Sequence, residues 1–171
     1  MNTAPASTET RPHAGQDWGH RPIILHYVPD LAVRQGRRSI ALCGQPVTCD
    51  QEATSKGLTG GEGVVCPMCD LERERLARRC QDPDEPIYPL AVSLGLQDLM
   101  IHEAGLTVCE LADRTGLDAR RLHRELMSGQ VPVDHMRQIA QACGTGMDGV
   151  LMRVEAAERA INTTRRGQAN D

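Results

Sequence analysis

The chain has 171 residues, a formal net charge of −4 and seven cysteines. This length allows one ordinary domain or two small ones, and the acidic balance excludes a general polyanion binder, so any contact with nucleic acid must come from a local basic patch. Aromatic residues make up 2% of the chain and phenylalanine does not occur. A core without them must use Leu, Ile, Val, Met and Ala, which suits small helical units.

Residues 1–20 predict a disordered arm, because Thr, Pro, Ser, Gly and Gln dominate them. They lack the basic start and apolar run of a secretory signal, and no apolar segment approaches the length needed to cross a bilayer. We therefore expect a cytoplasmic protein with no membrane contact. In a reducing cytoplasm, seven cysteines are more typical of metal binding than of disulfide bonds.

Residues 21–80 predict a small zinc-binding module. Short strand-like runs around residues 23–28, 38–42 and 64–65 carry or precede four metal-ligand side chains: His26, Cys43, Cys66 and Cys69. The Cys-Pro-x-Cys turn lets two thiolates point at one ion, and the Cys-Gly pair forms a second open turn. Three thiolates and one imidazole make a stable closed tetrahedron around Zn²⁺. We therefore predict a structural zinc ion held by these four residues.

The segment 54–63 supports this prediction, since it is polar and rich in glycine and cannot bury a core by itself. A bound ion would replace the missing apolar contacts. The residues alone leave two alternatives open. Cys49 could take the place of His26, which would give a four-cysteine site, or the module could hold no zinc.

Catalytic or redox use of the same residues is less consistent with the sequence. Zinc deaminases need a His-x-Glu motif and a Pro-Cys-x-x-Cys turn, whereas His26 precedes Tyr27 and Val28, and Val65 precedes Cys66. An iron–sulfur cluster needs a further cysteine at compact spacing, and Cys80 lies beyond a charged helix. We therefore predict that the protein is not an enzyme.

The order of His26, Cys43-Gly44 and Cys66-Pro67-x-Cys69 resembles that of small zinc-binding proteins of actinobacteria and their phages. The resemblance covers only this module. It implies a structural metal site and is compatible with a phage-encoded protein.

Residues 81–89 predict a linker, because three prolines among three acids break a helix and keep the backbone extended. Residues 90–161 predict a helical domain, with apolar positions at three-and-four spacing from Leu90, from Pro132 and from Met147. Gly95 lowers the helix propensity of the first of these helices. Residues 162–171 are polar and predict a flexible tail.

Two further helices are marked by their ends. Thr107 and Glu110 form a capping box for one helix, and Gly116 stands where this helix can end in the left-handed conformation. Asp118 then caps the next helix. Two helices joined by such a tight glycine turn predict a helix-turn-helix, in which the second helix enters the DNA major groove.

Leu122 and Leu126 lie one turn apart on this second helix and should face the core. The positions predicted on its open side are Arg120, Arg121, His123 and Arg124. Arginine suits guanine through its bidentate fork and phosphate through its charge. The same arginines could instead form a solvated helix face, since helix-turn-helix units also serve as protein-docking modules.

The order of these signals resembles the five-helix domain of Cro and the lambda repressor, the family that includes xenobiotic-response-element regulators. The match runs from Leu90 to Val154 and includes the Thr107 cap, the Gly116 turn and the Gly129 loop. It implies a mainly α fold and sequence-specific binding of double-stranded DNA as a homodimer by a transcription regulator or repressor. The DNA-binding residues it implies are Thr107, Arg120, Arg121, His123, Arg124 and Gln130.

A second function class remains open from the sequence. Glu125 and Asp118 dilute the positive face, and loop solvation explains Gln130 as well as a phosphate contact does. The protein could therefore be a phage or bacterial interaction module that captures a host regulator without reading DNA.

Overall fold

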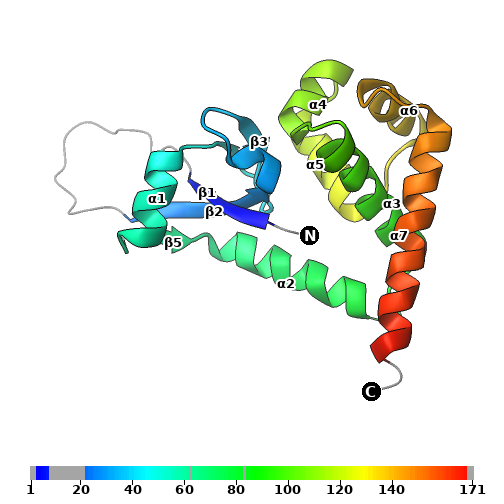
Figure 1. The fold of residues 1–171 in the computed structure, drawn as a ribbon, viewed down its shortest axis with the longest axis horizontal. Helices are drawn as coiled ribbons and strands as arrows, with labels where there is room; N and C mark the ends of the chain where they lie inside the picture. The colour runs from blue at the N-terminus through cyan, green and yellow to red at the C-terminus, as the bar shows by residue number, and fades with distance from the viewer. Residues whose placement is uncertain (1–2, 8–21, 62, 83, 169–171) are drawn as a thin grey trace. The chain divides into compact units, whose positions relative to one another are not determined.

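The computed structural model describes residues 3–7, 22–61, 63–82 and 84–168. The chain divides into two compact units, Met1–Glu72 and Arg73–Asp171. Within the described residues, strands occur only in the first unit, and the chain as a whole is mainly helical (Figure 1). The prediction of a mainly helical chain with a small strand-containing N-terminal region is confirmed.

A three-stranded sheet forms the base of the first unit. Strand β1 (Thr3–Ser7) pairs antiparallel with β2 (Ile23–Pro29), and β2 pairs parallel with β5 (Gly63–Val65). Part of the predicted disordered arm, 1–20, is therefore a strand, because its backbone pairs with β2 despite a polar, proline-containing sequence. The other residues of this arm lie outside the described ranges.

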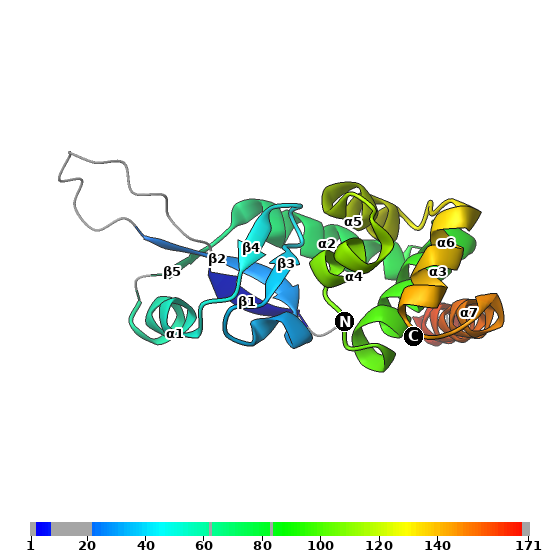
Figure 2. The same ribbon diagram turned by 90° about the horizontal axis from the view of Figure 1, so that it is seen from above.

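Helix α1 (Gln51–Thr59) packs against this sheet (Figure 2). The Asp50 carboxylate caps it by accepting hydrogen bonds from the two backbone N–H groups of Glu52 and Ala53. At Gly57 an added Cβ would lie 2.9 Å from a methyl group of Leu25 on β2, so glycine permits the close packing. The described part of segment 54–63 therefore packs on the sheet through Thr54 and Gly57 and buries no large apolar side chain, since Leu58 is exposed.

A hairpin of β3 (Arg38–Ile40) and β4 (Pro46–Thr48) and a short 3-10 helix, η1 (Asp30–Val33), complete the first unit. Side chains alternate between the two faces of a strand. Leu25 therefore faces α1, whereas its neighbour His26 faces the opposite side. One buried cluster of the unit consists of Val28, Ala32, Ala41, Val47, Cys66 and Cys69.

Helix α2 (Pro67–Gln81) begins in the first unit and continues into the second. The second unit also contains five further α-helices and one π-helix within the described residues. These are α3 (Ile87–Asp98), the π-helix η2 (Leu99–Glu103), α4 (Val108–Thr115), α5 (Ala119–Ser128), α6 (Val133–Ala142) and α7 (Met147–Gln168). Helix α3 packs on α5 and α7, α4 packs on α5 and α6, and α6 packs on α7.

Gly95 explains how α3 and α7 approach each other. A Cβ at this position would lie 2.8 Å from the backbone nitrogen of Val154 on α7, a separation that real Cβ atoms do not adopt. Leu96 of α3, next to this crossing, is buried, as are Val150 and Val154 of α7. The glycine that weakens the helix locally is therefore the residue that permits the largest helix–helix contact of this unit.

The predicted linker and the predicted tail are both shorter than expected. Helix α2 runs to Gln81 and α3 begins at Ile87, so the predicted linker 81–89 is reduced to a short connection. Pro89 fits in the first turn of α3, where a helix needs no N–H donor. The predicted tail 162–171 is helical as far as Gln168. Arg165 stabilises both segments by donating to the carbonyl oxygens of Glu85 and Arg79.

The described residues contain no helix that is long and apolar enough to span a bilayer.

Candidate metal centre and candidate nucleic-acid interface

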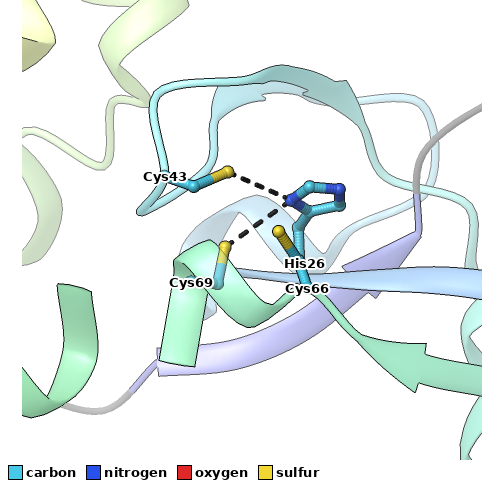
Figure 3. Close-up of side chains that lie close together, drawn as sticks. All are labelled: His26, Cys43, Cys66 and Cys69. Carbon is cyan, nitrogen blue, oxygen red and sulfur yellow. Dashed lines mark hydrogen bonds between the residues drawn. The ribbon is translucent and has the colours of Figure 1, made fainter. Parts of the chain in front are cut away.

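The four predicted metal ligands meet at one point of the first unit (Figure 3). His26 comes from the middle of β2, Cys43 from the turn between β3 and β4, Cys66 from the residue after β5, and Cys69 from the first turn of α2. One ligand atom from each residue lies within 4.8 Å of all the others. Residues separated by up to 43 positions therefore form a cluster that could bind a metal ion.

Two tight backbone turns aim the cysteines at this point. In the first, the N–H of Gly44 donates to the carbonyl of Ala41, and Gly44 adopts a φ of +84° that favours glycine. In the second, the N–H of Cys69 donates to the carbonyl of Cys66 at 3.0 Å. The N–H of Cys66 itself donates to the carbonyl of Leu25 in β2, which ties this turn to the strand that carries His26.

The imidazole of His26 presents Nδ1 to the sulfurs. This nitrogen lies 3.3 Å from Sγ of Cys43 and 3.5 Å from Sγ of Cys69. Burial lowers the pKa of His26, which favours the neutral imidazole that a metal ion requires. The ring is 5% exposed, so its orientation is set by the protein and not by solvent.

Burial raises the pKa of the Cys69 thiol to about 12, although backbone hydrogen bonds from Tyr27 and Cys43 act in the opposite direction. Desolvation disfavours a thiolate unless a positive charge lies beside it. A divalent cation at the centre of the cluster would provide that charge, while the backbone N–H groups would stabilise the bound sulfur. The surroundings are therefore suited to a metal-bound thiolate and unfavourable to a free one.

Cys49 does not belong to the cluster. It is buried, its N–H donates to the carbonyl of Arg37, and its own carbonyl accepts from Gly36. Burial raises the pKa of its thiol, and the charge of Asp50 acts in the same direction. Cys49 therefore behaves as a small core residue, and the alternative ligand set in which it replaces His26 has no support from the geometry.

We expect Cys49→Ala to retain the same metal content per chain as the wild type, because the substitution leaves the four clustered side chains in place. Metal analysis of freshly purified, reduced protein measures this content. Loss of the metal in a variant that is still folded would show that Cys49 is a ligand.

The second candidate site is the exposed face of α5. Thr107 and Glu110 form the predicted capping box of α4, which ends at Gly116 with a φ of +72°. Asp118 caps α5 by accepting a hydrogen bond of 2.7 Å from the N–H of Arg121. These local predictions are confirmed, and only the three residues 116–118 separate α4 from α5.

The predicted DNA-binding residues divide into two groups. Those that are exposed are Arg120, Arg121, Arg124 and Gln130. By contrast, Thr107 is 2% exposed and its hydroxyl caps α4. His123 is 8% exposed, so its predicted place on the open side is wrong. It lies one residue after Leu122 and three before Leu126, and the buried stripe of α5 is wide enough to include it.

Glu125 was expected only to dilute the positive charge of this face, and its contact with α6 was not predicted. Its carboxylate accepts from Nε of Arg121 at 2.8 Å and lies 2.6 Å from Nδ1 of His135 on α6. The spacing of four residues from Arg121 was a signal in the sequence, whereas no local pattern indicates His135. Burial of the Glu125 carboxyl raises its pKa, but the hydrogen bonds from His135 and Arg121 outweigh this effect and lower it overall.

This lowered pKa predicts acid sensitivity. A carboxyl group whose pKa is lower in the folded state than in the unfolded state stabilises the protein at pH values above its unfolded pKa, about 4.3. This stabilisation is lost as the pH falls through the folded pKa. We expect Glu125→Gln to be less stable than wild type near neutral pH, with a difference that shrinks on acidification below about pH 4.3. Thermal unfolding of both proteins across this range measures it. A difference that is independent of pH would contradict the assignment.

Comparison with known proteins adds no relative to this description. No family model, no curated protein and no solved structure matches the chain. The resemblance to the lambda repressor family therefore remains a prediction.

Proposed function

We propose that this chain is a sequence-specific DNA-binding transcription regulator of the repressor type, with a structural zinc ion in its first unit and a helix-turn-helix in its second. The observation that carries the proposal is the α4–α5 pair. Two capped helices are joined by three residues, and the second helix exposes three arginines within its first two turns. The N-terminal part of the second helix is the part that contacts base edges in this motif.

The electrostatics of this helix end support a DNA contact. Asp118 lies at this helix end, and its carboxylate already accepts a hydrogen bond from the helix backbone. Within the described residues, Arg120 and Arg124 form no ion pair, so their charges are available to phosphates. A helix N-terminus also favours an anion through its free N–H groups. A local basic patch can thus bind DNA even though the protein as a whole is acidic.

Zinc is the metal that best fits the first site. A tetrahedron with Zn–S bonds of about 2.3 Å and a Zn–N bond of about 2.0 Å has ligand–ligand edges of about 3.5 to 3.8 Å. The two N···S distances of 3.3 and 3.5 Å are close to these edges. Four protein donors leave no open position for a substrate, which is typical of structural zinc and not of catalytic zinc.

Selection from a random duplex library tests the DNA-binding role. We expect wild type to enrich one sequence, with two-fold symmetry if a homodimer binds. The variant Arg120→Ala/Arg121→Ala/Arg124→Ala should bind it at least about 100-fold more weakly, with a salt slope reduced by about one for each arginine that meets a phosphate. Arg159→Ala/Arg166→Ala on α7 is the matched control, since it also removes exposed arginines from a helix.

The competing function is protein docking without DNA recognition. The exposed apolar side chains Leu151 and Met152 on α7, 48% and 64% exposed, favour it. In that case a stable complex with a host protein would form, no duplex would be enriched, and the triple variant would bind DNA as weakly as wild type. That pattern would refute the DNA-binding proposal.

A further inference from the structure

Glu125 stands out among the acids of the second unit because it contacts two helices. Its side chain is 13% exposed and reaches Arg121 on its own helix and His135 on α6. The side chain of Arg121 is 58% exposed, so the ion pair joins a largely buried carboxylate to an accessible guanidinium. The imidazole of His135, itself 15% exposed, holds the carboxylate from the other side.

Helix stability does not explain this pair. An acid four residues before a basic residue is the favourable order in a helix, whereas here the arginine comes first. Glu125 also lies toward the C-terminal end of α5, where the helix dipole disfavours a negative charge. Glu155 and Arg159 on α7 show the favourable order, at 3.9 Å and with both side chains exposed. The contact with His135 accounts for the stabilising role of Glu125, whereas its pair with Arg121 is better explained by what it does to the guanidinium.

The contact uses one edge of the guanidinium group. Glu125 engages Nε of Arg121, and no hydrogen bond within the described part of the chain engages the terminal nitrogens Nη1 and Nη2. These two nitrogens form a planar fork that matches O6 and N7 of guanine. We infer that Glu125 is a positioning residue for base recognition, which holds Arg121 so that its terminal fork reads a guanine in the major groove.

This inference rests on the proposed DNA-binding function and separates the three arginines by role. Arg121 is oriented by a carboxylate that α6 keeps in place. Arg120 and Arg124 form no ion pair within the described residues and have no such orientation. Arg121 therefore reads a base, whereas Arg120 and Arg124 contact phosphates, which carry no sequence information.

The test measures base discrimination and overall affinity separately. The probes are the duplex selected by wild type, its single-base-pair substitutions and an unrelated duplex of equal length. We expect Arg121→Ala to lose about tenfold discrimination at one G·C pair. Glu125→Gln and Glu125→Ala should each lose about three- to tenfold of the discrimination at that same pair. An arginine that is not held in place can still bind the guanine, but it adopts the binding orientation less often. Binding to the unrelated duplex should stay equal or increase, because a negative charge has been removed.

A loss of discrimination without a loss of unspecific affinity distinguishes positioning from damage to the fold, which would lower both. Glu155→Gln is the matched control and should change neither. The double variant Glu125→Ala/Arg121→Ala should discriminate no worse than Arg121→Ala alone. If wild type selects a sequence and the Glu125 variants keep full discrimination at every pair, the positioning role is refuted while the DNA-binding function stands. If wild type selects no sequence, both are refuted.

Discussion

Cys69→Ser is expected to abolish metal binding and to unfold the first unit of the chain. Cys69 is fully buried, provides one of the four clustered ligand atoms and belongs to the small apolar cluster of this unit. Structural zinc contributes about 10 to 16 kcal/mol in zinc-finger peptides, which exceeds what a core of this size can replace. Metal analysis should give one zinc ion per wild-type chain and none in the variant, and backbone NMR should show loss of dispersed signals for residues 22–61.

The matched control is Cys80→Ser, which removes a half-buried cysteine of α2 outside the cluster and should keep the zinc. A chelator should reproduce the effect of Cys69→Ser on wild type, and signals from α4 and α5 should persist in both cases. A first unit that remains folded after the ion has been removed would show that the metal is not structural.

Gly95→Ala is expected to destabilise the second unit by about 1 to 3 kcal/mol, the usual cost of overpacking a core. Alanine normally stabilises a helix interior relative to glycine by about 0.5 to 1 kcal/mol. Here the added methyl group would meet the α7 backbone at Val154 and Arg153, at 2.8 to 2.9 Å, and a backbone cannot move aside as a flexible side chain can. Chemical denaturation followed by circular dichroism measures the change.

Gly167→Ala on α7 is the control for this substitution, since an added Cβ there meets no atom within 4 Å. It should leave stability unchanged or raise it slightly, because alanine is the better helix former. If both variants are equally stable, the close approach of α3 and α7 at Gly95 is incorrect.

The local features of this protein could be read from the sequence alone. Helix ends depend on residues that are neighbours in the chain, so the capping box at Thr107, the left-handed Gly116 and the Asp118 cap were predictable from their spacing. The Cys66 and Cys69 pair was also predictable, because a Cys-Pro-x-Cys turn needs only local backbone geometry, whereas the choice of His26 over Cys49 needed the tertiary structure. The chemistry of thiolates and imidazole then limits what the remaining ligands can be.

Other features depend on partners that are distant in the sequence. Strand β1 exists through its pairing with β2, Gly95 has a role only because α7 crosses there, and Glu125 gains its second partner from α6. His123 is buried because the packed face of α5 is wider than the positions of Leu122 and Leu126 alone suggest. The sequence by itself thus determined the capped ends of α4, the start of α5 and the pairing of Cys66 with Cys69, since these depend on short-range geometry. The tertiary structure decided which faces are covered and which charges meet, because those depend on contacts that no local pattern encodes.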